Sequence, residues 1–410
     1  MTLQDAAHLP RLRPAGVLYT AKTRELPLLA DFAHELTARG WRVGGLVQET
    51  LRGPDGYKRA IVATDLGTGA EITLATYKGD RSKESECGFD TAALAEATRA
   101  VRRAVETRAD IIVIEKFGRR ETEGSGLFDE ILAAMAEGIP TVTLVSADAL
   151  EEWNRLTGDL GVLLAAEPSG LWRWWGAHRL YRDLEQGVED QTAARVLIGF
   201  NWVLVEGPHG CGLAQTPDRG SAACRGIADG SGLAGRSLRE LAAMVHSWDP
   251  VKAAVGLAAI NAFYNRFDLD VPDGNGLETF AAADEPVSVV GRFASLTKHI
   301  KNPLVFESDP ADGEYPQAAA SWLLPDSERV IVTASTLVNH SLPGILGSCP
   351  DAQVALVGPS TPLSPRLHSY GVDTLAGMIV EDVEGAVRAI SEGGSLKALK
   401  RCARMATLNA

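Results

Sequence analysis

Several features of common protein classes are missing from this chain. No run of about 18 apolar residues occurs, so we expect no membrane-spanning helix. The opening residues lack the apolar core of a signal peptide and predict a short mobile tail over residues 1–14. The five cysteines are scattered, odd in number and without a CxxC pair, so a disulfide framework is not expected. A reducing cytoplasm suits them best.

Positive charge is also scarce. The formal net charge is -13, which argues against nucleic acid as a partner, because attraction to phosphate needs a basic surface. We likewise expect no membrane partner. The acidic balance still allows a local basic pocket for a small anion. No HExxH and no GxSxG motif occurs, so hydrolytic zinc or serine chemistry has no support.

The first part of the chain alternates strands and helices. The length of 410 residues favours two or three domains. Alternation of this kind implies an α/β fold with a mostly parallel sheet covered on both faces. We expect strands at 15–21, 41–50, 111–118 and 141–146, helices at 26–40, 91–110 and 126–140, and a hairpin over 57–76 that turns at "GTG".

The pattern changes near residue 176. Residues 195–217 predict an antiparallel hairpin that turns at "GPHG", followed by helices at 237–248 and 250–267, so this piece is α+β. From residue 285 the alternation returns with five strands, which predicts a second, smaller doubly wound domain. The expected segments are a tail at 1–14 and domains at 15–175, 176–284 and 285–410.

The stretch "IIVIEKFGRRETEG" (111–124) ends a buried strand in a loop full of charge. Ligands of α/β sheets collect beyond the carboxyl ends of strands. One interpretation is a solvated charged loop. The other is a site at which Glu115 or Glu121 holds a cation such as Mg²⁺ and Lys116 or Arg119 faces an anion.

A phosphate-binding loop would complete such a site, but the first strand runs into "YTAKTRELPLL". Lys22 and Thr23 match the end of the phosphate-loop motif, whereas the glycines that let the backbone wrap a phosphate are absent. We therefore expect no enzyme-like ATP hydrolysis through this domain. A smaller oxyanion near Lys22 is compatible with the residues.

Two loops in the last domain carry hydroxyls after apolar strands. The first contains Ser335, Thr336 and Asn339, and the second contains Gly358, Ser360 and Thr361. Both are expected at one edge of the sheet, where they predict a ligand crevice; helix capping without a ligand is the alternative. Gly291, after the first strand of this domain, is a further candidate for anion or nucleotide binding. It is a single glycine where a dinucleotide fingerprint would have three, so no nicotinamide or flavin cofactor is expected.

Histidine and cysteine cluster at one place. His209 and Cys211 share a face if the segment is extended, and Cys224 offers a third soft ligand for a transition metal. Turn formation at "GPHG" and packing of a small cysteine are the alternative. In "LWRWWGAHRL" (171–180) the tryptophans either stack on a flat ligand or are buried at a domain or subunit interface. The second alternative favours a homo-oligomer.

These residues resemble two known families. The blocks "ARGWRVGGLVQE", "ECGFD", "IIVIEKFGRRETEG" and "GIPTVTLVS" resemble a bacterial domain of unknown function, related to thermophilic-type nucleoside-triphosphatases and linked to molybdenum transport genes. That resemblance covers residues 15–175 and implies a degenerate P-loop-like fold. The blocks "IGFNWVLVEGPHGCGLAQT", "AAVGLAAINAFYN", "VVGRF", "VFE" and "VALVGPSTPLSP" resemble the heavy-metal chelation family. This second resemblance implies an enolase-N-terminal-like domain followed by a Rossmann-like domain.

Two functional hypotheses follow. The first is a cytoplasmic protein that binds and handles a metal or its oxyanion, with molybdate as the first candidate. The second is an enzyme of metallocofactor or small-molecule metabolism that uses a phosphate- or nucleotide-like ligand. The sequence shows no catalytic dyad, so it leaves both open.

Overall fold

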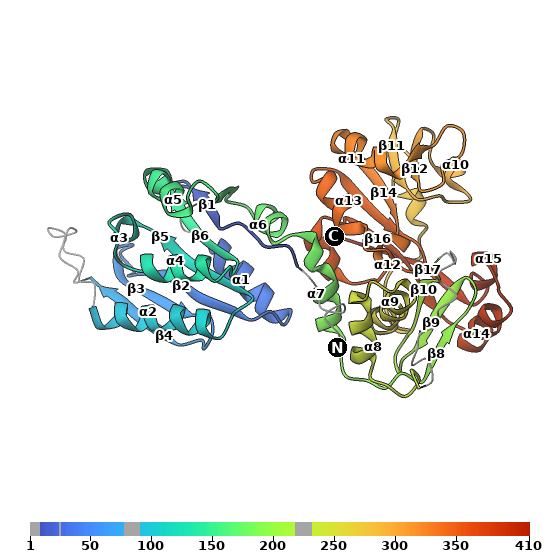
Figure 1. Ribbon diagram of the computed structural model, residues 1–410, viewed down its shortest axis with the longest axis horizontal. Coiled ribbons are helices and arrows are strands. Elements are labelled where there is room, and N and C mark those ends of the chain that lie inside the picture. Colours follow the sequence, from blue (N-terminus) through green and yellow to red (C-terminus); the bar gives the residue numbers. More distant parts are fainter. Residues whose placement is uncertain (1–8, 24–25, 78–90, 218–231) are drawn as a thin grey trace. The chain divides into compact units, whose positions relative to one another are not determined.

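The computed structural model describes residues 9–23, 26–77, 91–217 and 232–410. The described residues divide into two compact units, Pro10–Trp175 and Gly176–Ala410. We call them the first and the second unit and describe each by itself (Figure 1). Within the described ranges, no helix combines the length and the apolar character that crossing a membrane requires.

The first unit is built on a seven-stranded sheet with the order β4-β3-β2-β5-β6-β1-β7. The five strands from β2 to β7 in this order are parallel, and β3 and β4 extend the sheet as an antiparallel hairpin. This confirms the α/β class and the hairpin, and adds the edge strand β7. The strands are β1 (Ala15–Tyr19), β2 (Val43–Arg52), β3 (Lys58–Asp65), β4 (Glu71–Thr76), β5 (Ile111–Phe117), β6 (Thr141–Ser146) and β7 (Val162–Ala165).

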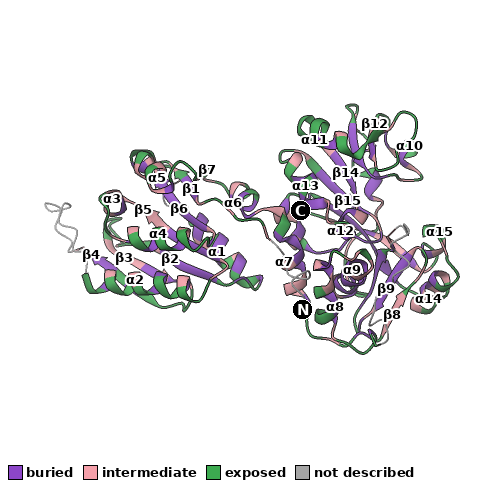
Figure 2. Ribbon diagram, viewed as in Figure 1, coloured by how far each residue is buried: buried purple, intermediate pink, exposed green. Residues whose placement is uncertain are grey.

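The buried strands of this sheet are covered by helices whose outer faces are exposed (Figure 2). Apolar residues of α2, α4 and α5 share one core with β5, whereas α1 contacts α6. A Cβ at Gly44 in β2 would lie 2.3 Å from the Cβ of Ala104, so glycine there lets α2 approach the sheet closely. The helices are α1 (Leu28–Ala38), α2 (Thr91–Glu106), α3 (Arg119–Thr122), α4 (Phe128–Ala136), η1 (Ala147–Ala149), α5 (Leu150–Thr157) and α6 (Pro168–Trp175).

The second unit begins with a three-stranded antiparallel sheet, β8 (Arg195–Ile198), β9 (Trp202–Glu206) and β10 (Cys211–Gln215). The predicted hairpin over 195–217 was therefore incomplete. The chain makes an additional turn, in which the Gly199 N–H donates to the Trp202 carbonyl, and this turn splits the first arm into β8 and β9. The helix α9 (Pro250–Tyr264) is buried over most of its length and packs on β9 and β10.

A second seven-stranded sheet follows, with the order β13-β12-β11-β14-β15-β16-β17. All neighbours pair in parallel except β16 and β17. The five strands expected from the sequence are present, and the short β13 and the final β17 are additional. The strands are β11 (Val287–Val290), β12 (Pro303–Glu307), β13 (Tyr315–Pro316), β14 (Arg329–Thr333), β15 (Gln353–Val357), β16 (Thr374–Val380) and β17 (Ala403–Asn409).

Short helices connect these strands. Asp382 caps α14 by accepting the N–H of Gly385 at 2.9 Å, and Asp249 caps α9 by accepting the N–H of Val251 at 2.9 Å. The remaining helices are η2 (Ala177–Arg179), α7 (Leu180–Gly187), α8 (Leu238–Ala242), η3 (Ala243–His246), η4 (Gly276–Glu278), α10 (Leu296–His299), η5 (Gln317–Ala319), α11 (Ala320–Leu323), η6 (Leu324–Asp326), α12 (Ser335–Val338), α13 (Leu342–Ser348), η7 (Pro365–Tyr370), α14 (Val383–Ser391) and α15 (Leu396–Leu399).

Candidate ligand-binding site

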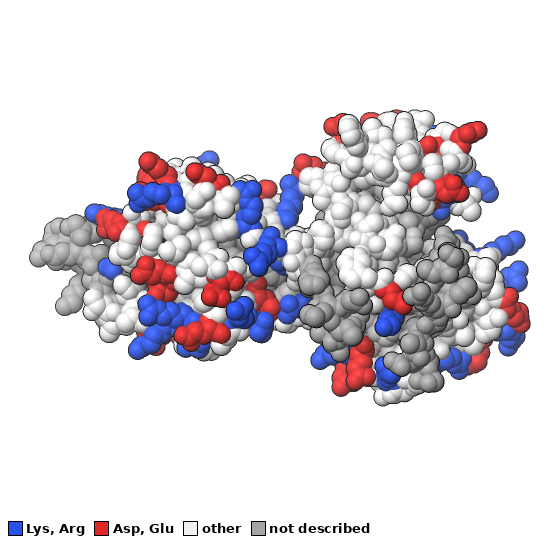
Figure 3. All heavy atoms as spheres, viewed as in Figure 1, with Lys and Arg blue, Asp and Glu red and all other residues white. Residues whose placement is uncertain are grey.

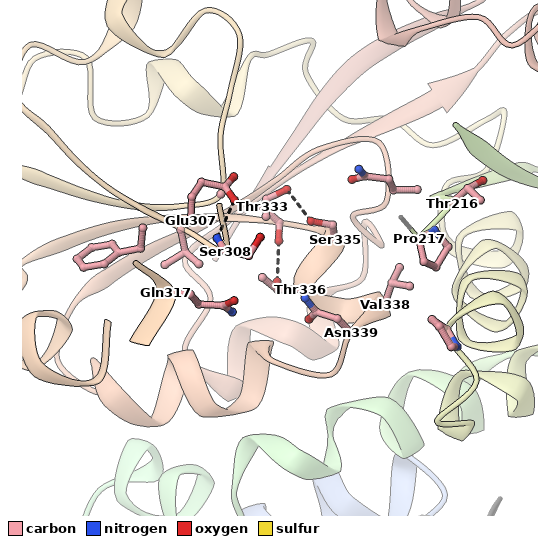
Figure 4. Close-up of a pocket in the computed structure, with 15 residues that line it drawn as sticks. Thr216, Pro217, Glu307, Ser308, Gln317, Thr333, Ser335, Thr336, Val338 and Asn339 are labelled. Carbon is pink, nitrogen blue, oxygen red and sulfur yellow. Dashed lines mark hydrogen bonds between the residues drawn. The ribbon is translucent and has the colours of Figure 1, made fainter. Parts of the chain in front are cut away.

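A pocket of about 270 Å³ opens at the carboxyl ends of β11, β12 and β14 in the second unit. These strand ends supply Gly291, Glu307 and Thr333, and the start of α12 supplies Ser335 and Thr336 (Figure 4). The other lining residues are Gln215, Thr216, Pro217, Pro250, Val290, Phe306, Ser308, Gln317, Val338 and Asn339. The pocket thus lies between the seven-stranded sheet of the second unit, the end of β10 and the start of α9.

Gly291 allows the strand ends to approach each other at this point. Its φ is +99°, and a Cβ there would lie 2.4 Å from Cγ2 of Thr333. The Gly291 N–H donates to the carbonyl of Phe306 at 2.9 Å, which holds it directly beside the end of β12. A side chain at position 291 would therefore strain the backbone and push β11 away from β14.

Hydroxyl groups form the centre of the pocket. Oγ1 of Thr333 lies 3.2 Å from Oγ of Ser335, and the Thr336 hydroxyl donates to the Thr333 carbonyl at 2.6 Å. Figure 4 shows these three side chains between Glu307 on one side and Thr216 and Pro217 on the other. The predicted residues Gly291, Ser335, Thr336 and Asn339 all line the pocket.

The second predicted loop has a different role. Ser360 and Thr361 are buried, and the Ser360 hydroxyl accepts the N–H of Gln215 at 2.9 Å. The Asn261 amide donates to the Ser360 carbonyl at 3.0 Å, and the Asn265 amide donates to the Thr361 carbonyl at 3.0 Å. This loop, which begins at Gly358, thus fixes β10 and α9 to the sheet. Ligand contact by Gly358, Ser360 and Thr361 stays a prediction.

Charge in the pocket is limited to one carboxylate. Glu307 is the single ionisable residue among the described residues that line it. Its Oε2 accepts the N–H of Ser308 at 3.0 Å. The side chain is half-buried, so the carboxylate keeps acceptor capacity toward the pocket. This chemistry suits a ligand that presents hydroxyls or positive charge.

The charged side chains at the end of β5 and in the following loop interact with different partners. Glu115 is half-buried and accepts the N–H of Gln48 at 3.3 Å; burial raises the pKa of its carboxyl group. The Lys116 ammonium lies 5.7 Å from the ring centroid of Tyr19 at the end of β1. Glu115 and Lys116 therefore lie near the end of β5, and ion binding by them stays a prediction.

Arg119 and Glu121 are engaged within their own loop. The exposed Arg119 pairs with Glu123 at 2.9 Å. Glu121 is buried and accepts the N–H groups of Gly118 at 2.9 Å and Leu127 at 3.1 Å. Burial raises the pKa of the Glu121 carboxyl group. These contacts give Glu121 a structural role, and ligand binding by either residue stays a prediction.

The turn after β1 holds Lys22 and Thr23. Lys22 is exposed, and the Thr23 hydroxyl accepts the N–H of Thr20 at 2.9 Å. Residues 24–25 lie outside the described residues. On the face that Figure 3 shows, basic and acidic side chains are interspersed over the first unit. Oxyanion binding at Lys22 stays a prediction.

The predicted metal ligands His209 and Cys211 differ in exposure. His209 is exposed, whereas Cys211 is fully buried at the start of β10. Burial, followed by the nearby Glu206 carboxylate, raises the pKa of the Cys211 thiol to about 12, which opposes the thiolate that metals prefer. Cys224 lies outside the described residues. Among the residues that the structure describes, no three His, Cys, Asp or Glu side chains are grouped to hold a metal ion.

The tryptophans of α6 are buried inside the first unit. The ring centroids of Trp172 and Phe32 are 5.3 Å apart, and those of Trp175 and Trp41 are 4.9 Å apart, both edge to face. The Arg39 guanidinium lies 4.5 Å from the centroid of the Trp172 ring. This cluster joins α6 to α1, so it contributes to the core of the unit.

Sequence reasoning missed Glu307, Thr333 and Gln317 as site residues. Glu307 and Thr333 each end an apolar strand of the second doubly wound segment, and that position was a usable signal. Gln317 and Gln215 carried no such signal, because their place at the pocket depends on how distant segments meet. Position at a strand end was therefore a local signal for the lining residues Glu307 and Thr333.

Three family models match the chain. Residues 14–174 match a family described as "Protein of unknown function (DUF2478)". Residues 181–264 and 277–409 match two families that are both described as "Putative heavy-metal chelation" (DUF4213 and DUF364). These matches confirm both resemblances seen in the sequence.

Individual relatives agree with this division. The chain is 39% identical over 171 residues to the molybdenum import ATP-binding protein ModC 2 of Bradyrhizobium diazoefficiens, and the match covers 42% of this chain but only 19% of that protein. It is 27% identical over 186 residues to an uncharacterized protein of Methanocaldococcus jannaschii, covering 42% of this chain and 72% of that protein. A crystal structure of a DUF364-family protein of unknown function from Desulfitobacterium hafniense matches 57% of this chain and 97% of its own, with 27% identity and a TM-score of 0.51.

Proposed function

We propose that this chain handles a metal, with molybdenum as the first candidate, and that it binds a metal-bearing small molecule in the pocket of the second unit. The observation that carries the proposal is the pocket itself, which is rich in oxygen donors and lies within the segments matched by the heavy-metal chelation models. The match of the first unit to part of a molybdenum import ATP-binding protein supports the choice of metal.

The lining of the pocket limits the form in which a metal enters. Glu307 and the hydroxyls of Thr333 and Ser335 are oxygen donors, which suit hard metal centres. One carboxylate does not make a complete cage, and a negative charge in the pocket disfavours bare molybdate. We therefore propose a metal that arrives already chelated by an organic ligand.

We also propose a fold class for each of the two seven-stranded sheets. In chain order, the strand sequence β13-β12-β11-β14-β15-β16 reads 3-2-1-4-5-6, the order of a doubly wound dinucleotide-binding sheet. The pocket lies where this order reverses, between β11 and β14. We propose a Rossmann-like class for this sheet. For the first unit we propose a degenerate P-loop-like class, supported by Lys22 after β1 and Glu115 near the end of β5.

The proposal also covers the location of the protein and its assembly. The scattered cysteines support a cytoplasmic site of action, and the net charge of -13 supports a chain without a nucleic-acid partner. We also propose a homo-oligomer. Exposed aromatic side chains of the second unit, Trp248 and Trp322, are 70% and 82% exposed and are available for such contacts.

An enzyme of small-molecule metabolism is the second candidate function. The observation that favours it is Glu307, an acid at the end of the second strand of a Rossmann-like order. In nucleotide-binding sheets an acid near this place contacts the ribose. A metal-handling protein has no need of that contact unless its ligand contains a sugar.

Elemental analysis of purified protein tests the proposal. The full chain, purified from a molybdate-supplemented host, should retain about one equivalent of metal, as measured by mass spectrometry. A Ser335→Phe variant places a ring in the pocket and should lose the metal. Ser391→Phe adds the same ring at an exposed residue of α14 and should retain it. No metal in the wild type, or equal metal in both variants, contradicts the assignment to this pocket.

A further inference from the structure

We propose that the pocket of the second unit recognises the ribose of a nucleoside, with Glu307 accepting hydrogen bonds from the ribose hydroxyls. This inference rests on the pocket assigned under the proposed function and names the chemical class of its ligand. Figure 4 shows Glu307 and Ser308 at one side of the pocket, facing the hydroxyl group of Thr333.

The backbone places Glu307 at the position where a doubly wound sheet contacts ribose. Val290 of β11 pairs with Phe306 of β12, so Gly291 and Glu307 leave the sheet side by side. The Gly291 N–H donates to the Phe306 carbonyl at 2.9 Å, which fixes this juxtaposition. Because Gly291 has no side chain, nothing projects from the end of β11 between Glu307 and Thr333. This arrangement leaves a surface on which a sugar can lie beside the carboxylate.

The chemistry of the lining calls for a donor opposite Glu307. No lysine or arginine is among the described residues that line the pocket. The Arg292 guanidinium interacts electrostatically with Glu307 from outside the lining, whereas its hydrogen bonds go to Glu314 and to the Asp309 carbonyl. A half-buried carboxylate facing such a space is best satisfied by two hydroxyls, which can bind its two oxygens together. The cis-diol of a ribonucleoside presents two adjacent hydroxyls in this way. A 2′-deoxyribonucleoside lacks one of these two hydroxyls.

The same strand ends argue against a pyrophosphate in the ligand. Gly291 is the only glycine of the β11–α10 turn, and α10 spans only Leu296–His299. Arg292, the basic residue next to Gly291, is held by Glu314 at 3.1 Å and by the carbonyl of Asp309 at 3.0 Å. Neither a glycine-rich loop nor an available cation is therefore offered to a diphosphate. The 5′ substituent of the ligand is expected to be neutral or positively charged.

Size and apolar surface agree with a single nucleoside. The volume of about 270 Å³ is close to the lower end of small-molecule pockets, about 300 Å³. Val290, Phe306 and Val338 line the pocket as almost fully buried apolar side chains, and only their small exposed edges are open to a base. Phe306 is itself held in place by Tyr315, with the ring centroids 5.7 Å apart and stacked. A dinucleotide would exceed this space.

Calorimetric titration of the full chain with ribonucleosides and their 2′-deoxy counterparts tests the inference. We expect one of adenosine, guanosine, cytidine and uridine to bind the wild type, and its 2′-deoxy form to bind about tenfold more weakly or worse. Glu307→Gln should weaken the ribonucleoside by about tenfold and reduce its advantage over the deoxy form. The control Asp309→Asn removes a charge two residues away, outside the pocket lining, and should bind as the wild type does.

The outcomes separate this inference from the proposed function. No ribonucleoside binding to the wild type, equal binding of the deoxy form, or unchanged binding by Glu307→Gln overturns the ribose assignment. The comparison of ribose with deoxyribose uses wild-type protein alone and does not depend on the folding of a variant. Metal retained by protein that binds no nucleoside overturns only this inference. Nucleoside binding by protein that retains no metal overturns only the metal-handling function.

Discussion

The two seven-stranded sheets of this protein present different side chains at the carboxyl ends of their parallel strands. In the first unit these ends carry Glu115, Lys116 and the charged loop that follows them, whereas in the second unit they carry Gly291, Glu307 and Thr333. Much of the charge in the first unit is used to hold its own loop, as the contacts of Glu121 and the Arg119 pair show. The strand ends that line the pocket of the second unit carry one charge, that of Glu307, and their small residues leave space for a pocket. The pocket of the second unit thus forms at strand ends with small residues, whereas the strand ends of the first unit carry dense charge.

The largest loss of stability is expected when Asn265, which holds the loop at 358–363 of the second unit, is replaced. Asn265 is fully buried; its amide donates to the carbonyls of Thr361 at 3.0 Å and Met378 at 3.2 Å, and its Oδ1 accepts the N–H of Leu363 at 2.8 Å. Asn265→Ala leaves these buried backbone groups without partners and should lower the free energy of unfolding by about 3 kcal/mol. Denaturant titration measures the loss.

Asn339→Ala is the control for this change. Asn339 is exposed at the pocket and accepts the N–H of Ser341 at 3.1 Å, so its loss should cost about 0.5 kcal/mol or less. Equal losses for the two variants would contradict the division between a structural loop at 358–363 and a pocket segment at 335–339, which comprises α12 and its C-cap Asn339.

An intermediate effect is expected in the charged loop of the first unit. Glu121→Ala removes the acceptor of two backbone N–H groups, those of Gly118 and Leu127, and should lower the free energy of unfolding by about 2 kcal/mol. The exposed pair of Arg119 and Glu123 offers the control, and Glu123→Ala should cost at most about 0.5 kcal/mol. If Glu121→Ala is as mild as the control, Glu121 is not a structural residue and its role as a ligand gains weight.

The smallest effect is expected in the pH dependence of stability. Burial raises the pKa of Glu115 above its ordinary value of 4.5, so the folded chain favours the protonated form. This contribution to stability is full below pH 4.5 and is lost as the pH rises through the folded-state pKa. Glu115→Gln mimics the protonated form. It should therefore be more stable than the wild type at pH 8, with an advantage that shrinks as the pH falls toward 4.5.

Thermal unfolding between pH 4.5 and pH 8 measures this difference. Glu123→Gln removes one negative charge from the same loop and serves as the control for the change in net charge. An advantage of Glu115→Gln that grows toward low pH would show that the carboxylate form is favoured in the folded chain. The comparison with the second unit would then change, because a stabilised carboxylate at a strand end indicates a nearby cation.

Local sequence patterns determined most of the secondary structure. The helices α1 and α2, the hairpin of β3 and β4, and five parallel strands of the second sheet follow from apolar periodicity and glycine turns. The short edge strands β7 and β13 were not predicted, because a brief edge strand has little pattern of its own and depends on its neighbour. The antiparallel β17 was not predicted either. The turn at Gly199 was missed because it lies within a mostly apolar run, which it divides into two strands.

The sequence by itself placed Ser335, Thr336, Asn339 and Gly291 among the candidate site residues, because small and hydroxyl residues after apolar strands are a local signal. Only the tertiary structure decided that they meet Glu307, Gln215 and Gln317 around one pocket, while Ser360 and Thr361 are buried under α9. Residues such as Gln215 and Ser335 are far apart in the chain. Their meeting depends on the packing of α9 and β10 against the sheet, which is the sum of many contacts and leaves no motif in the sequence.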